Sequence, residues 1–263
     1  VGSEMCIRDS IRVKKNFSII GIHDHSYLIG SENMEQMERN SQSSIRQRLW
    51  RIRAKHVILA TGAIERPLVF AGNDIPGVML CSAALEFYKL YGVSPGDRVV
   101  VLTNNDSAYS SVIELFNAGI SVPLVIDVRE KSNGNLPLKA KKLGIRVEFN
   151  KAISKVIGKK KVKAVELCSV VGEGAVLETI ICDSVLMSGG WTSTLNLWSH
   201  CGGKIKWDSK LNTLVPDESF PSINEYGRSF ITVLGSADGK FWPSDLFANI
   251  EKKLNIDFSF FGE

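Results

Sequence analysis

The sequence predicts an α/β fold with two doubly wound domains, one of which is split in the chain by the other. Strand-like and helix-like stretches alternate over residues 82–149, an order that builds a parallel sheet with crossover helices. Two further apolar strands, over 55–60 and 229–234, each run into a glycine and lie on either side of that stretch. We expect these two strands to belong to a second domain that the first one interrupts.

The amino-terminal part of the chain carries weaker patterns. Residues 1–10, VGSEMCIRDS, have no usable period and resemble a cloning or assembly scar, so we expect the natural protein to begin further upstream. Weak alternation over 11–29 predicts two or three short strands, and the polar stretch 30–47 predicts a loop. The continuous apolar run before Gly62 predicts a strand buried on both faces.

The interrupting domain begins after a stretch rich in proline and glycine, residues 67–77, which predicts a turn-rich linker. The elements that follow are, in order, a helix over 83–91, a strand over 98–103, a helix over 107–118, a strand over 122–126, a helix over 136–143 and a strand over 145–149. The segment from 98 to 126 has the order of elements and the length of one βαβ crossover.

A β-meander is predicted as an insert in this domain. Alternating apolar and polar residues over 152–157, 161–170 and 175–181 predict three antiparallel strands, followed by a last strand that runs into Gly189. We therefore assign 81–204 to an inner NAD-binding-type domain, and 11–80 with 205–263 to a partial outer FAD/NAD-binding domain. Both are expected to be dinucleotide-binding, Rossmann-like domains.

Composition narrows the possible functions. The net charge of +4 is small for 263 residues, and no basic stripe is interleaved with aromatic residues, which argues against nucleic acid as a partner. No apolar stretch approaches the roughly 20 residues that span a bilayer. The five cysteines include no C-x-x-C pair, which favours buried thiols over a redox disulfide. We expect a cytoplasmic protein without a membrane partner, and the isolated histidines predict no metal site.

The loop after the strand 98–103 is the first candidate site. In dinucleotide sites a glycine-rich turn lets the backbone approach the pyrophosphate at a helix amino terminus. Here the turn is Thr-Asn-Asn-Asp-Ser-Ala, without glycine, and Asp106 adds a negative charge. Two interpretations stay open: a modified phosphate loop, or a nucleotide domain that has lost its nucleotide. The candidate cofactor-binding residues of this loop are Thr103, Asn104, Asn105 and Ser107.

An acidic residue stands where NAD sites place the carboxylate that binds a ribose hydroxyl. Asp127 stands at the end of the strand over 122–126, 24 residues after Thr103, which would favour NAD over NADP. Arg129 nearby makes that preference less distinct. An Asp at a strand end is also common without any ligand, so both interpretations stay open.

The remaining candidates lie at the ends of other strands, where glycine lets a chain pass close to a dinucleotide. No residue is assigned a catalytic role. These cofactor-binding candidates are Ala60, Thr61 and Gly62, then Arg66 as a phosphate or carboxylate partner, Gly189 and Gly190, and finally Gly235 and Ser236.

Three stretches carry a resemblance to a known family. They are AKHVILATGAIERPLVFAGNDIPGVML at 54–80, GDRVVVLTNNDSAYSSVIELFNAGI at 96–120 and SVLMSGGWTSTLNLWSHCGGKIKWD at 184–208. Together they resemble the alpha subunit of heterotetrameric sarcosine oxidase, within the pyridine nucleotide-disulfide oxidoreductase-like FAD/NAD(P)-binding proteins. The resemblance covers roughly residues 45–239 and is weaker over 11–44.

The resemblance implies an oxidoreductase subunit. In that family the full complex oxidatively demethylates sarcosine to glycine, passes electrons through flavins (FAD/FMN) to oxygen, and uses tetrahydrofolate to accept formaldehyde. NAD is associated with the alpha subunit, and the partners are the other subunits of a hetero-oligomeric oxidase. Two alternatives are the alpha half of a related amine- or opine-oxidising flavoprotein, and a non-catalytic scaffold subunit that holds a partner's flavin site.

We also expect the chain to be a fragment. No strand followed by GxGxxG precedes residue 57, and the family's carboxy-terminal folate-type domain would not fit within 263 residues. The outer domain would then be truncated at its amino terminus. On that expectation, the isolated fragment binds no nucleotide tightly and is inactive.

Overall fold

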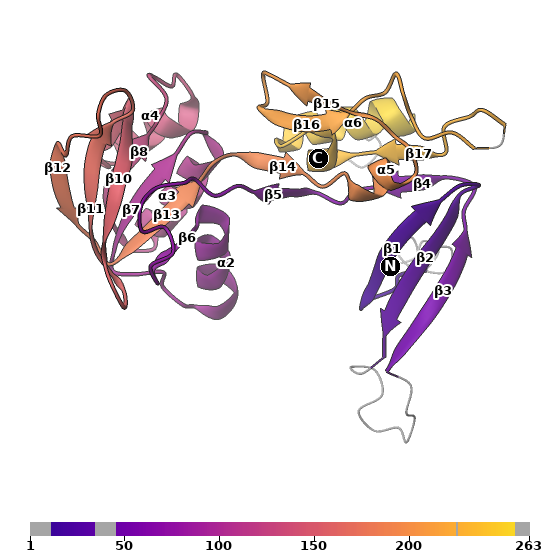
Figure 1. Ribbon diagram of the computed structural model, residues 1–263, viewed down its shortest axis with the longest axis horizontal. Helices are drawn as coiled ribbons and strands as arrows, with labels where there is room; N and C mark the ends of the chain where they lie inside the picture. Colours follow the sequence, from indigo (N-terminus) through magenta and orange to yellow (C-terminus); the bar gives the residue numbers. More distant parts are fainter. Residues whose placement is uncertain (1–11, 35–45, 225, 256–263) are drawn as a thin grey trace, which may run out of the picture. The chain divides into compact units, whose positions relative to one another are not determined.

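The computed structural model describes residues 12–34, 46–224 and 226–255, which form two compact units (Figure 1). The outer unit comprises the described residues up to Ala63 and from Ser193 onward, and the inner unit comprises Ile64–Thr192. The predicted scar at 1–10 lies outside the described residues.

The inner unit is built on a five-stranded parallel sheet. Its strands are β6 (Val78–Leu80), β7 (Arg98–Thr103), β8 (Ser121–Asp127), β9 (Val147–Phe149) and β13 (Ser184–Ser188). They lie in the order β6-β13-β7-β8-β9, and every pairing is parallel. The central strands are apolar because both faces of the sheet are covered.

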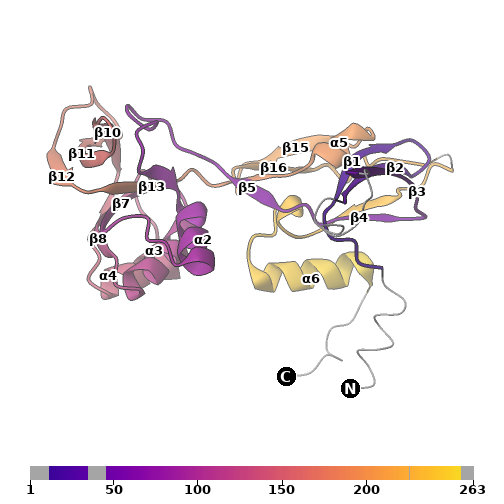
Figure 2. The ribbon, with the colours of Figure 1, turned by 90° about the horizontal axis from the view of Figure 1, so that it is seen from below.

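Helices cover one face of this sheet and the meander covers the other (Figure 2). The helices α2 (Cys81–Tyr91), α3 (Ser107–Asn117) and α4 (Asn135–Lys142) pack on side chains such as Val99 and Val101. The meander strands β10 (Lys151–Gly158), β11 (Val162–Ser169) and β12 (Glu178–Ile181) pack on Val100 and Leu102. Alternate residues of β7 therefore enter two different cores, as the period of a strand requires.

The outer unit contains a second antiparallel meander of β1 (Phe17–His23), β2 (Tyr27–Asn33) and β3 (Gln47–Arg53). Beside it, β4 (Val57–Leu59) and β17 (Ile231–Val233) pair in parallel, although they are far apart in the sequence. The hairpin β15 (Ile205–Asp208) with β16 (Thr213–Pro216), and the helices α5 (Asn196–His200), η1 (Gly235–Asp238) and α6 (Pro243–Leu254), complete this unit. Two short paired strands, β5 (Ala63–Glu65) and β14 (Trp191–Ser193), carry the chain from one unit into the other.

The α/β prediction, the parallel sheet and the inserted meander are confirmed, whereas several local predictions are wrong. Residues 30–33 form the end of β2, not a loop, because buried Glu32 accepts hydrogen bonds from Lys14 (2.9 Å) and the Trp50 indole (2.7 Å). The strand before Gly62 is not buried on both faces, since Ile58 is 49% exposed.

The limits of the two units also differ from the predicted domain limits. The sequence predicted domain limits at 80/81 and 204/205, whereas the chain passes from one compact unit to the other at 63/64 and 192/193. At the first limit the difference involves β6, which the sequence assigned to the outer domain but which pairs with β13 at an edge of the inner sheet.

Among the described residues, no helix is long and apolar enough to cross a membrane, and no group of three metal-ligating side chains gathers. The four cysteines in the described part of the chain are free thiols.

Candidate functional site

The inner sheet has a topological switch point between β7 and β13. The chain leaves β7 toward β8 on one side, and β13 lies on the other side of β7. In open α/β sheets, ligands bind outside the carboxyl ends of the strands at such a point. Here those ends carry Thr103 and Ser188, which pair directly across the two strands.

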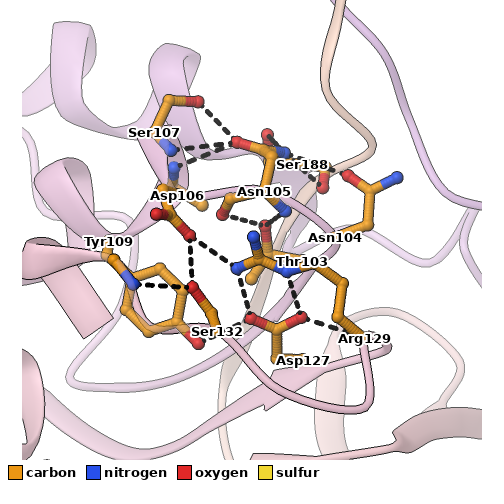
Figure 3. A network of polar contacts seen from close by, with 12 residues as sticks. Thr103, Asn104, Asn105, Asp106, Ser107, Tyr109, Asp127, Arg129, Ser132 and Ser188 are labelled. Carbon is orange, nitrogen blue, oxygen red and sulfur yellow. Dashed lines mark hydrogen bonds and ion pairs between the residues drawn. The ribbon is translucent and has the colours of Figure 1, made fainter. Parts of the chain in front are cut away.

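The glycine-free loop at this point is filled by the side chain of Asn105 (Figure 3). Its amide oxygen accepts hydrogen bonds from the Ser107 backbone N–H (3.1 Å), the Ser107 hydroxyl (2.6 Å) and the Ala108 backbone N–H (3.4 Å). Its amide nitrogen donates to the carbonyl (3.1 Å) and the hydroxyl (3.0 Å) of Ser188. Asn105 therefore joins the start of α3 to the end of β13.

The other residues of the loop are also held in place by hydrogen bonds. The Asn105 backbone N–H donates to the Thr103 hydroxyl oxygen at 3.1 Å. The Asn104 amide donates to the Gly189 carbonyl at 3.3 Å, and the Trp191 indole donates to the Ser107 hydroxyl at 2.8 Å. The four predicted loop residues therefore come together, and they contact one another and the end of β13.

Asp127 lies at the end of β8, fully buried, and both of its carboxylate oxygens have partners. The Arg129 guanidinium donates to both oxygens, at 3.0 Å and 2.7 Å, and the Tyr109 hydroxyl donates to one of them at 2.8 Å. Burial first, and then the charge of Asp127, raise the pKa of the Tyr109 phenol, which keeps it a neutral donor.

The same arginine reaches a second carboxylate. Arg129 donates to Asp106 at 2.7 Å, and the Ser132 hydroxyl donates to the same Asp106 oxygen at 3.0 Å (Figure 3). Asp106 is the residue that precedes α3. One guanidinium therefore bridges the loop after β7 and the end of β8.

The glycines at the end of β13 contact the protein's own backbone. The Gly189 N–H donates to the Arg66 carbonyl at 2.7 Å, and the Arg66 N–H donates to the Gly190 carbonyl at 2.8 Å. A Cβ on Gly189 would lie 2.9 Å from the Pro67 carbonyl oxygen, and one on Gly190 would lie 2.9 Å from an Arg66 guanidinium nitrogen. This close packing by itself accounts for both glycines.

The outer unit brings together the other predicted residues. Ala60 and Thr61 are exposed after β4, and the Thr61 hydroxyl donates to the Thr194 carbonyl at 2.6 Å. Gly62 has a φ of +75°, and in the part of the chain that the structure describes a Cβ there would meet, within 4 Å, only the Ser236 hydroxyl oxygen, at 3.8 Å. Gly235 after β17 also has a positive φ, of +70°. Because β4 and β17 are adjacent and parallel, their two glycine ends lie side by side.

The sequence did not indicate that Tyr109 and Ser132 belong to the inner network. The charges of Asp106, Asp127 and Arg129 were the available signal, because a carboxylate in a loop and another at a strand end can share one arginine. The hydroxyl partners carry no such pattern and depend on the folded sheet.

The parallel sheet with its meander insert, together with the split outer unit, defines the fold of FAD/NAD(P)-binding oxidoreductases. Thioredoxin reductase from T. acidophilum superposes with a TM-score of 0.62 at 19% identity, covering 94% of this chain and 76% of that one. L-proline dehydrogenase from P. horikoshii superposes with a TM-score of 0.52 at 23% identity, covering 92% of this chain and 41% of that one. These similarities establish the fold.

The sequence comparisons identify the particular relatives. No family model matches the chain. It is 32% identical to the alpha subunit of sarcosine oxidase from Rhizobium meliloti over 85% of this chain and 22% of that protein, and 34% identical to that of Corynebacterium sp. (strain P-1) over 76% and 21%. The chain is therefore a relative of the sarcosine oxidase alpha subunits, which confirms the predicted resemblance. It spans about a fifth of the length of these two relatives.

Proposed function

We propose that this chain is the dinucleotide-fold portion of an oxidoreductase subunit of the sarcosine oxidase type. In this proposal it assembles with the other subunits of a hetero-oligomeric oxidase that demethylates sarcosine oxidatively to glycine. The observation that carries the proposal is the 32% identity to a sarcosine oxidase alpha subunit over 85% of this chain.

The outer unit has the features that fit a dinucleotide. A nucleotide in this fold lies against the carboxyl ends of parallel strands, where glycine permits close approach. Gly62 and Gly235 supply two such ends, and a Cβ on Gly62 would lie 3.8 Å from the Ser236 hydroxyl oxygen. We propose that NAD binds there in the full subunit, with Ser236 as a hydroxyl partner, while FAD or FMN is held elsewhere in the complex. Bound NAD and flavin would supply the hydride and electron transfer.

The test is the nucleotide content and activity of the complete complex. The subunit is purified with its co-expressed partners, the nucleotides released on denaturation are identified, and oxygen uptake with sarcosine is measured. We expect NAD and flavin to be released, and sarcosine to be oxidised. A flavin-containing complex that leaves sarcosine untouched would contradict the proposed substrate.

A matched pair of variants tests the proposed NAD position. Gly62→Leu and Gly92→Leu both place a side chain on a positive φ, of +75° and +65°. Gly92 ends α2, and a Cβ added there would meet no other described residue within 4 Å, so this variant reports the backbone strain. Only Gly62→Leu is expected to lose NAD from the purified complex. Equal NAD content in both variants would contradict binding beside Gly62.

An opine-oxidising complex is the second candidate. The chain is 25% identical to an opine oxidase subunit from Agrobacterium tumefaciens (strain Ach5), over 61% of this chain and 35% of that protein. This alternative predicts oxygen uptake with an opine and none with sarcosine, so the same assay distinguishes the two.

A further inference from the structure

We propose that the inner unit is closed to dinucleotides, because Asn105 and Arg129 satisfy the groups that a nucleotide's phosphate and ribose would otherwise contact. The inference concerns the switch point between β7 and β13. It stands whether or not the outer unit binds NAD.

The phosphate side of the site is occupied by Asn105. In a dinucleotide site, the free N–H groups at the start of the helix after the first strand receive the pyrophosphate. Here the N–H groups of Ser107 and Ala108 donate to the Asn105 amide oxygen, and that of Tyr109 donates to the Asp106 carbonyl at 3.1 Å. A phosphate would have to displace an amide that is also anchored to Ser188.

The charge of the loop also disfavours a phosphate. Asp106 immediately precedes α3, so its carboxylate lies near the partial positive charge of the helix start. Gly134 packs against this carboxylate so closely that a Cβ would lie within 2.9 Å of its carbon. Asp106 and Asp127 share the single guanidinium of Arg129, so these three groups together carry a net negative formal charge, which opposes a phosphate at the start of α3.

The ribose side is occupied by Arg129. A carboxylate binds the ribose hydroxyls of NAD only if its oxygens can accept their hydrogen bonds. Both oxygens of Asp127 already accept from Arg129, one also accepts from Tyr109, and the carboxylate is fully buried. Freeing Asp127 for a ribose would leave Arg129 without one of its two carboxylate partners. The loop residues and Asp127 therefore do not fit a bound dinucleotide.

The first test opens the phosphate side. Asn105→Gly removes the amide and introduces a glycine. The control, Asn104→Gly, makes the same change at the neighbouring residue, whose side chain bonds to Gly189 and Asn105 and not to the start of α3. Because the Asn105 amide is lost from both the start of α3 and Ser188, we expect Asn105→Gly to lower the melting temperature by about 4 °C. Inorganic phosphate should raise the melting temperature of Asn105→Gly part of the way back to that of wild type. It should not raise the melting temperature of wild type or Asn104→Gly.

A failure of phosphate to stabilise Asn105→Gly would overturn the role assigned to Asn105. Stabilisation of wild type and Asn105→Gly to the same extent would overturn it as well, because the site would then be open already.

The second test uses the unaltered protein in its complex, and so does not depend on the folding of a variant. Amide hydrogen exchange is measured for residues 104–108 with and without NAD. We expect no change there. Slower exchange at Ser107 and Ala108 in the presence of NAD would overturn the inference. Exchange at 60–62 and 235–236 reports on the proposed outer site alone, so the two proposals can fail separately.

Discussion

Asp127 is a buried carboxylate whose charge is balanced chiefly by one arginine. The sequence located this residue at a strand end with Arg129 two residues further along, but its partner Tyr109 could not be predicted, because Tyr109 meets Asp127 only when α3 packs on the sheet. The same is true of Asn105, whose place in the loop was predicted and whose bonds to Ser188 depend on the neighbouring strand.

The ion pair of Asp127 with Arg129 contributes to the stability of the inner unit. Arg129→Met leaves Asp127 buried without its cation, so the free energy of unfolding should fall by about 3–5 kcal/mol. Adding Asp127→Asn to that variant removes the buried charge, and the double variant should recover part of the loss. Tyr109→Phe should cost only about 1 kcal/mol, because it removes a single hydrogen bond. Urea unfolding measures the stability of all three variants. If Arg129→Met and the double variant lose the same free energy of unfolding, Arg129 does not balance the charge of Asp127.

Most elements of the inner unit could be predicted from local sequence. The strand over 98–103 and the helix that begins at Ser107 agree with β7 and α3, because apolar runs and helical periods are local signals. β6 was missed, since three half-buried residues become a strand only by pairing with β13. The hairpin of β15 and β16 was also missed, because its strands have only four residues each.

Helix α2 begins beside a buried carboxylate that accepts hydrogen bonds from its first turn. Its amino terminus is held by Glu65 of β5, which is 5% exposed and accepts from the Ser82 N–H (2.8 Å) and hydroxyl (2.7 Å). Glu65→Ala should therefore lower the free energy of unfolding by about 2 kcal/mol, as the loss of a charged cap does. Glu86→Ala, on the exposed face of the same helix, should change it by no more than about 0.5 kcal/mol. Similar losses in thermal unfolding of the two variants would show that Glu65 is not the cap.

The two units differ in how the chain builds them. The inner unit is one continuous segment, and two complete hydrophobic clusters lie within it, one on each face of the sheet. The core of the outer unit combines residues from both flanking segments, such as Ile22 and Phe230. The sequence indicated this interruption through two strands that each end on glycine, but not the place where the units meet.

This organisation predicts that the inner unit folds alone. A protein of residues 64–192 should unfold in one cooperative transition and give dispersed amide resonances, since it retains both clusters. Its folding should need no added nucleotide, because Asn105 and Arg129 already fill the switch point. A product that melts without cooperativity, or that folds only when NAD is added, would contradict this description.

We propose that the dinucleotide binds to the outer unit of the full subunit and not to the inner one. An experimental structure of the complete complex with NAD tests this assignment most directly. We predict density for the dinucleotide at the carboxyl ends of β4 and β17, beside Gly62 and Ser236, with Asn105 still bonded to Ser107 and Ser188. Density for NAD between Asn105 and Asp127, with Arg129 displaced, would contradict it.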